Sequence, residues 1–164
     1  MCSMLYPQLT RDVEVIAMID NGTVNLSKKI NMLHLMASGK YLALLNDDDV
    51  IPRDYVSYIL EAAKSDADIL LGEIHQWWNT WKYEDVKVVC SYENVIPAKS
   101  ELVRKYCVYD EGEGAGSQDS RVSAKLAQNT TSVHNMNKPI YYHLRRDASQ
   151  VDPYIFEELK CELQ

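Results

Sequence analysis

The sequence predicts an α/β domain with a mostly parallel central sheet. In the first half of the chain, β-rich apolar runs alternate with segments of helical periodicity, and turn residues follow the runs. The chain has 164 residues, of which 46% are apolar, so it is long enough for one compact core and short for two. We therefore expect a single domain over residues 1–164.

The first strand–helix–strand unit is predicted between residues 13 and 45. Val13 to Ile19 is β-rich and ends at an Asp-Asn-Gly turn signal, which is typical of a strand. From Asn25 to Ala37 the apolar residues recur at helical spacing, and Ser38-Gly39 follows as a stop signal. Tyr41 to Leu45 is the next apolar run, so we expect a strand parallel to the first.

A further helix and strand complete the α/β half, which covers residues 1–73. The helix is expected from Pro52 to Lys64 and the strand from Ile69 to Leu71. The pattern is then less regular, and Val86 to Val89 is expected as a strand of an antiparallel region. An aromatic cluster precedes it, for which core packing competes with a platform for a sugar or base; it contains Trp77, Trp78, Trp81 and Tyr83.

The second half, residues 74–146, contains two more predicted helices and a last strand. The helices run from Ala98 to Tyr106 and from Ser117 to Gln128, and the strand from Pro139 to Leu144. Between the helices, the glycine-rich acidic residues 109–117 are expected to form a mobile surface lid. In the tail, residues 147–164, Asp152 to Gln164 has the pattern of an amphipathic helix.

Charge and cysteine content exclude several classes of protein. The net charge of −7 argues against broad electrostatic capture of nucleic acid or of an anionic membrane. The cysteines are far apart and form no C-x-x-C pair, so neither a zinc site nor a secreted disulfide framework is indicated; they are Cys2, Cys90, Cys107 and Cys161. No apolar stretch has the length of a membrane span and no signal peptide is apparent, so we expect a cytoplasmic protein without a membrane partner.

Three consecutive carboxylates, Asp47, Asp48 and Asp49, follow the apolar run 41–45. A buried strand that ends at acids presents fixed oxygens at the carboxyl edge of a sheet, where open α/β folds bind ligands and where hard divalent cations find ligands. Adjacent carboxylates repel one another unless a cation or hydrogen-bond donors compensate them. The competing interpretation, equally supported by the acids alone, is a solvated turn that caps the next helix.

The acids belong to an ordered set of motifs that extends to about Arg146. The set comprises Asp20-Asn21-Gly22, Ser27-Lys28-Lys29-Ile30-Asn31, Ala37-Ser38-Gly39-Lys40-Tyr41, Asn46-Asp47-Asp48-Asp49 with Asp54-Tyr55, Asn94-Val95-Ile96-Pro97-Ala98-Lys99, and Gln118-Asp119. In this order it resembles family 2 glycosyltransferases of the GT-A fold, nearest to the compact forms encoded by bacteriophages. The resemblance implies a GT-A-like sandwich and an inverting transferase that moves a sugar from a nucleotide-diphosphate donor, with Mn²⁺ or Mg²⁺ at the diphosphate.

The resemblance also implies roles for single residues at the metal and at the reacting hydroxyl. Asp47 and Asp49 match a D-x-D pair at the ribose and the cation, with Asp48 as a further oxygen ligand; counted from Asn46, the pair would begin with an amide. Asp119 matches the base that takes the acceptor proton. His143 matches a late histidine that completes the metal shell. Packing is the competing role of His143, and a favourable helix dipole that of Asp119.

The donor contacts implied by the resemblance are mostly basic. Asp20 matches the acid against the nucleoside base, and the basic residues suit a diphosphate. A solvated helix face is the competing interpretation for each single lysine. The implied donor contacts are Asp20, Lys28, Lys29, Asp47 and Lys99. Arg145 is a further expected diphosphate partner, because a guanidinium can donate two parallel hydrogen bonds.

One departure from the relatives concerns the start of the sheet. Relatives have a further strand and helix ahead of the segment at Val13, whereas Met1 to Asp12 alone precede it here. We therefore expect an N-terminally truncated sheet, whose open edge pairs with a second copy or another chain. This leaves an alternative function, a catalytically weak or inactive remnant that acts as a sugar-binding or assembly subunit. A nucleotidyltransferase is less favoured, and the acceptor, a glycan or a modified nucleic-acid base, is open.

Overall fold

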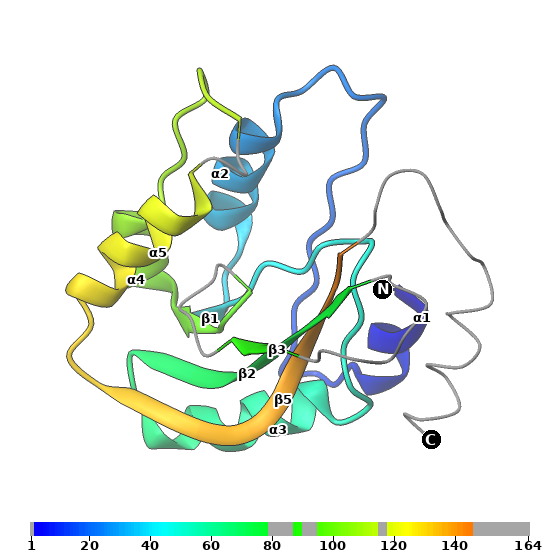
Figure 1. Ribbon diagram of the computed structural model, residues 1–164, viewed down its shortest axis with the longest axis vertical. Helices are drawn as coiled ribbons and strands as arrows, with labels where there is room; N and C mark the ends of the chain where they lie inside the picture. Colours follow the sequence, from blue (N-terminus) through cyan, green and yellow to red (C-terminus); the bar gives the residue numbers. More distant parts are fainter. Residues whose placement is uncertain (1, 79–86, 90–94, 115–117, 146–164) are drawn as a thin grey trace.

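The computed structural model describes residues 2–78, 87–89, 95–114 and 118–145. Helices and strands alternate along this part of the chain (Figure 1). In chain order they are α1 (Cys2–Leu5), the 3-10 turn η1 (Tyr6–Gln8), α2 (Leu26–Met36), β1 (Tyr41–Leu42), α3 (Tyr55–Ala62), the 3-10 turn η2 (Ala63–Ser65), β2 (Ile69–Trp78), β3 (Lys87–Val89), β4 (Ala98–Lys99), α4 (Ser100–Tyr106), α5 (Asp119–Gln128) and β5 (Val133–Arg145).

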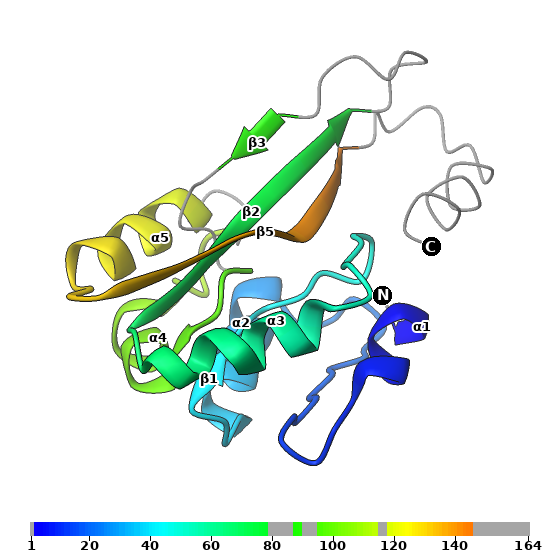
Figure 2. The same ribbon diagram turned by 90° about the horizontal axis from the view of Figure 1, so that it is seen from below.

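Within the described residues, the strands form one mixed sheet with β2 at its centre. The order is β1-β4-β2-β3, and β5 pairs with β2. The β2–β5 ladder is parallel, whereas β1–β4, β2–β4 and β2–β3 are antiparallel. The antiparallel strand at 87–89 is confirmed, and Figure 2 shows β2 between β3 and β5. The expected mostly parallel sheet is instead mixed, because β2–β5 is the one parallel ladder among the described strands.

The strand predicted from Val13 to Ile19 does not form in the described structure. The segment lies outside any ladder, and Val15 and Ile19 are 51% and 95% exposed. Glu14 tethers it near the start of β1, since its carboxylate accepts from the Ser38 backbone N–H at 2.7 Å and from the Ser38 hydroxyl at 3.1 Å. A β-rich run becomes a strand only beside a partner that satisfies its backbone groups.

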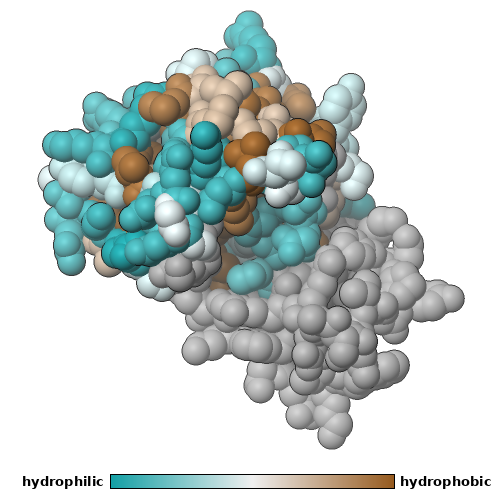
Figure 3. Space-filling view, turned by 90° about the horizontal axis from the view of Figure 1, so that it is seen from above, coloured by the Kyte–Doolittle hydropathy of each residue, from teal (hydrophilic) through white to brown (hydrophobic). Residues whose placement is uncertain are grey.

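Helix α2 confirms the helical prediction for residues 25–37. The Asn25 side chain accepts from the Ser27 backbone N–H at 2.8 Å and so caps the first turn. Ser27 and Ile30 face the interior, and the chain becomes extended at Ala37, where the helix ends. The face of the molecule drawn in Figure 3 nevertheless exposes hydrophobic side chains among polar ones.

The core lies between α3, the β2–β5 pair and the helices α4 and α5. Figure 1 shows α3 along β2 and β5, with α2, α4 and α5 grouped away from it. The buried cluster includes Ile69 and Ile74 of β2, together with Ile140 of β5. The strands approach closely at Gly72, where an added Cβ would lie 2.6 Å from side-chain carbons of Ile140. The β2–β5 register shifts at this point.

Strands β2 and β5 are longer than the sequence predicted. Strand β2 continues from Ile69 to Trp78, and β5 begins at Val133 instead of Pro139. Trp81, Tyr83 and the predicted tail helix lie outside the described residues, as do the side chains of Trp77 and Trp78. Among the described helices, none combines the length and the apolar character that crossing a membrane requires.

Candidate functional site

The predicted metal-binding acids lie in a turn that we call the acid turn, residues 46–49. It follows β1 and is fixed against β5, because the backbones of Val50 and Tyr142 exchange hydrogen bonds of 3.1 and 2.9 Å. Asp47 and Asp48 are exposed, whereas Asp49 is only 1% exposed. The acids therefore divide into two that face solvent and one that faces the interior.

Tyr141 holds the buried acid in place. Its hydroxyl donates to Oδ2 of Asp49 at 2.6 Å and accepts the Asn46 backbone N–H at 3.3 Å. The Asn46 side-chain amide donates to the same Oδ2 at 3.1 Å. Burial, followed by the hydrogen bond to Asp49, raises the pKa of Tyr141 far above its usual range. Asp49 therefore anchors the acid turn to β5.

The acid turn presents two exposed carboxylates, those of Asp47 and Asp48, as candidate metal ligands. Among the described residues, no three His, Cys, Asp or Glu side chains are grouped so that they could hold a metal ion by themselves. His143 lies on the same face of β5 as Tyr141, because side chains alternate along a strand. Magnesium typically takes one or two carboxylates together with substrate phosphates, and exposed Asp47 and Asp48 suit that mode. The metal ligands remain a prediction.

Two predicted donor contacts, Asp20 and Lys29, lie together ahead of and within α2. The Asp20 carboxylate accepts the backbone N–H groups of Gly22 at 3.1 Å and Val24 at 2.9 Å, and the Lys29 ammonium lies 3.0 Å from it. The hydrogen bond from Lys29 is the main reason why the pKa of Asp20 is lowered. Lys28, the next predicted contact, is exposed. The turn that leads into α2 is thus fixed. The Lys29 ammonium is directed toward Asp20, whereas the Lys28 side chain faces solvent.

The predicted base, Asp119, is the first residue of α5. Its Oδ1 accepts a hydrogen bond of 2.9 Å from the Tyr109 hydroxyl. The neighbouring Gln118 is 1% exposed, accepts the Asp110 backbone N–H at 2.6 Å and donates to the Asp110 carbonyl at 2.8 Å. The Gln118 side-chain amide thus serves as donor and acceptor at once. The described part of the predicted lid, residues 109–114, is anchored here.

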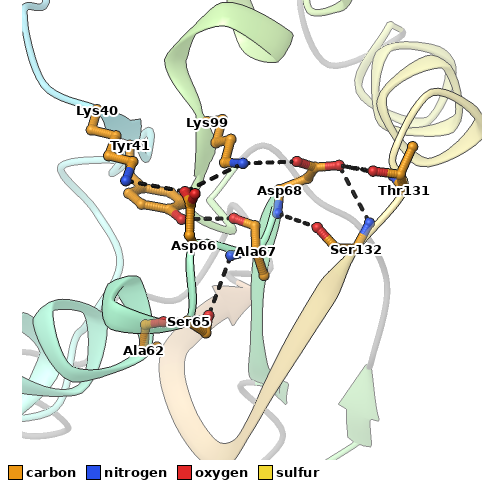
Figure 4. Close-up of polar contacts among 10 residues, drawn as sticks. All are labelled: Lys40, Tyr41, Ala62, Ser65, Asp66, Ala67, Asp68, Lys99, Thr131 and Ser132. Carbon is orange, nitrogen blue, oxygen red and sulfur yellow. Dashed lines mark hydrogen bonds and ion pairs between the residues drawn. The ribbon is translucent and has the colours of Figure 1, made fainter.

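The third predicted lysine, Lys99, lies in β4, beside the first residue of β1. It pairs with Tyr41 at the start of that strand, whereas the acid turn follows the strand's end. Its ammonium lies 3.1 Å from Asp68 and 3.4 Å from Asp66 (Figure 4). These carboxylates raise the pKa of Lys99, with Asp68 as the main cause. Lys99 thus joins β4 to the start of β2 through its ion pair with Asp68, and its donor contact remains a prediction.

The same network joins β1, β2 and β5 at their starts. Lys40 lies 3.0 Å from Asp66, and the Asp68 carboxylate accepts the backbone N–H of Thr131 at 2.9 Å and its hydroxyl at 2.7 Å (Figure 4). The bonds from Thr131 are the main cause of a pKa of Asp68 far below its usual range. Arg145 ends β5, and its side chain lies outside the described part of the structure.

Sequence reasoning missed Tyr109 and Tyr141, which contact the predicted site acids. Tyr141 and Asp49 are 92 positions apart, and Tyr109 and Asp119 are ten apart across a loop. No local period links such pairs, since a tyrosine in an apolar context predicts burial alone. The order of the motifs places the acids, and the tertiary fold supplies their partners.

No protein-family model matches the sequence, and no curated protein matches it. Solved structures of Staphylococcus aureus TarS resemble the fold. TarS 1–349 in complex with UDP-GlcNAc has a TM-score of 0.62 and 16% identity, with 91% of this chain and 48% of that chain covered. TarS 1–349 without a named ligand has a TM-score of 0.61, 15% identity, and 88% and 45% covered. The complex with UDP has a TM-score of 0.59, 15% identity, and 85% and 44% covered.

These structures confirm the predicted fold class. The chain has the α/β, GT-A-like fold of its structural neighbours. It spans about half the length of the TarS 1–349 chains that it matches. At 15 to 16% identity the likeness concerns the fold alone, and the nearness to bacteriophage forms remains a prediction.

Proposed function

We propose that this chain is a glycosyltransferase that moves a sugar from a nucleotide-diphosphate donor to an acceptor hydroxyl. The observation that carries the proposal is the shared fold with TarS 1–349, whose structure contains UDP-GlcNAc. Ligands of open α/β folds bind outside the carboxyl ends of strands, and two exposed carboxylates of the acid turn follow β1. Donor, acceptor and activity are all part of the proposal, because the match covers about half of the TarS chain.

The donor diphosphate would lie against the acid turn. Asp47 and Asp48 would hold Mn²⁺ or Mg²⁺ with the phosphate oxygens, and His143 is a further candidate ligand. When bound, such a cation offsets the charge that develops on the departing diphosphate. Asp49, fixed by Tyr141, keeps the turn in one conformation. This preorganisation matters because carboxylates that must reorient on binding lose affinity.

The nucleoside and phosphates would also approach the turn before α2. The Asp20–Lys29 pair is already formed at 3.0 Å, so Asp20 can accept a hydrogen bond from a base or ribose without being left as an isolated charge. Lys28 is exposed and suits a phosphate oxygen. These residues come from one short segment, which orients the donor relative to α2.

In the transfer step, Asp119 would act as the general base. Its carboxylate takes the proton from the acceptor hydroxyl while the acceptor oxygen forms a bond to the anomeric carbon. The bond from that carbon to the diphosphate oxygen breaks on the opposite side, and the nucleoside diphosphate leaves with the electron pair. Attack opposite the leaving group inverts the anomeric configuration.

The test combines donor binding with turnover. We expect a panel of UDP-, GDP- and TDP-sugars to contain a donor that raises the melting temperature in the presence of Mn²⁺ and releases nucleoside diphosphate. Asp119→Asn should retain donor binding and lose turnover. Glu101→Gln is the control, because Glu101 is also an acid in the first turn of a helix and its side chain is exposed. Unchanged turnover in Asp119→Asn would contradict the role of the base.

The exposed segment at Val13–Ile19 favours a second candidate, a subunit that assembles with another chain. Val15 and Ile19 expose apolar side chains on a β-rich run outside the described sheet. In that case no nucleotide sugar raises the melting temperature with Mn²⁺, and the mass in sedimentation increases with concentration or on addition of the partner. Donor-dependent release of nucleoside diphosphate by the isolated chain would exclude a purely structural subunit.

A further inference from the structure

We propose that Tyr109 is the positioning residue of the base Asp119, and that α2 holds Tyr109 in place. This inference rests on the proposed function. Tyr109 lies between α4 and α5 and is 1% exposed, and its hydroxyl donates to Oδ1 of Asp119 at 2.9 Å. A donor on one carboxylate oxygen restricts rotation of the group and sets where its oxygens lie.

The backbone of Tyr109 is fixed by a single side chain of α2. The Asn31 amide donates to the Tyr109 carbonyl at 2.8 Å, and its oxygen accepts the Tyr109 backbone N–H at 2.9 Å. Two hydrogen bonds to one planar amide define both the place and the direction of this backbone. Because a tyrosine side chain has few rotatable bonds, fixing its backbone in a packed interior also fixes its hydroxyl.

The residue before the base is attached to the same loop. Gln118 bonds to the backbone of Asp110, and its Nε2 lies 3.3 Å from both the Ser27 hydroxyl and the Glu113 carbonyl. The Ser27 hydroxyl in turn donates to the Glu113 carbonyl at 3.0 Å. Gln118, which precedes Asp119, and Tyr109, which donates to Asp119, are thus both hydrogen-bonded to side chains of α2.

This arrangement couples the two halves of the proposed site. Helix α2 carries Lys28 and Lys29, the proposed donor contacts, on the same turns as Ser27 and Asn31. The base therefore keeps a fixed relation to the donor through hydrogen bonds among the described residues. Misplacement of a reacting group by about 1 Å costs about a hundredfold in rate, so this relation has a measurable kinetic value.

The experiment uses the full chain with UDP-GlcNAc and Mn²⁺ as the first probe. Release of UDP, donor affinity and melting temperature are measured for Tyr109→Phe, Asn31→Leu, the double variant and Tyr55→Phe. Tyr55 is the control because it is also buried, and its hydroxyl has no hydrogen-bond partner among the described residues. We expect Tyr109→Phe to lower turnover about tenfold with unchanged donor affinity, and Tyr55→Phe to change neither.

The double variant tests whether Asn31 acts through Tyr109. We expect Asn31→Leu to lower turnover in the same direction, and the double variant to be no slower than the slower single variant. Fully additive losses would overturn the coupling to α2. Equal losses of donor affinity and turnover in Tyr109→Phe would overturn the positioning role in favour of a general structural one.

The failure of this inference differs from the failure of the proposed function. Wild-type turnover in Tyr109→Phe, with Asp119→Asn inactive, overturns the positioning role and leaves the transferase standing. No release of nucleoside diphosphate by the wild-type chain with any donor of the panel overturns the proposed base, and the positioning role with it.

Discussion

Removal of the Tyr141 hydroxyl should destabilise the protein and loosen the acid turn. Tyr141→Phe keeps the ring in its buried place and deletes the donor that lies 2.6 Å from Oδ2 of Asp49. Asp49 is 1% exposed, so water does not readily replace that donor. The substitution therefore tests whether the buried carboxylate is held by Tyr141, as the geometry indicates.

The expected loss follows from the type of bond. Hydrogen bonds to charged groups contribute about 1.5 to 3 kcal/mol, and we expect about 2 kcal/mol here because the Asn46 amide continues to donate to the carboxylate. For a chain of this size, that corresponds to a decrease of about 4 to 8 °C in melting temperature. The Asn46 backbone N–H also loses its acceptor, which acts in the same direction.

Tyr55→Phe provides a matched comparison. Tyr55 is 4% exposed, and its hydroxyl has no hydrogen-bond partner among the described residues, so its removal relieves a desolvation cost. We expect this variant to be as stable as the wild type or slightly more stable. Urea unfolding followed by far-ultraviolet circular dichroism measures both variants. Equal losses in the two, or a smaller loss in Tyr141→Phe, would refute the reasoning.

Two further substitutions test the fold. Gly72→Ala should cost about 1 to 3 kcal/mol in urea unfolding, because the added Cβ would lie 2.6 Å from carbons of fully buried Ile140; a cost below 0.5 kcal/mol would contradict this packing. The Thr131 N–H holds the pKa of Asp68 below its unfolded value, so the stability from this contact is complete above about pH 4 and is lost as the pH falls further. Asp68→Asn should therefore destabilise the protein at pH 7, and the difference from wild type should shrink on acidification; a difference independent of pH would contradict the assignment.

Local signals predicted the helices better than the sheet. Helix α2 combines a clear apolar period with a capping Asn25, and both act within one turn. Strand β4 has two residues, so it presents no period to detect. The first part of β5, which includes His134 and Asn135, is polar and forms a strand because it pairs with β2. Pairing depends on a neighbour, which a single segment does not specify.

The order of motifs located the acids of the candidate site and left their environments open. It placed Asp47 to Asp49 after the strand predicted at residues 41–45 and assigned Asp47 and Asp49 to a D-x-D pair, with Asp48 as a further ligand. The structure distinguishes Asp49 from the other two acids, since Asp49 is buried and accepts a hydrogen bond from the Tyr141 hydroxyl. Lys99 is paired with Asp68, a partner that the motif did not predict, and its donor contact remains a prediction. Charge alone does not indicate which partner a side chain meets.

We propose that the exposed acids of the acid turn bind a nucleotide sugar together with a divalent cation. The most direct test is the melting temperature with UDP-GlcNAc, with Mn²⁺, with both and with neither, for the wild type and for an Asp47→Asn/Asp48→Asn variant. We predict an increase for the wild type with both ligands present, worth about 2.7 kcal/mol at about a hundred times the Kd, and its loss in the variant. An equal increase without Mn²⁺, or in the variant, would contradict the claim.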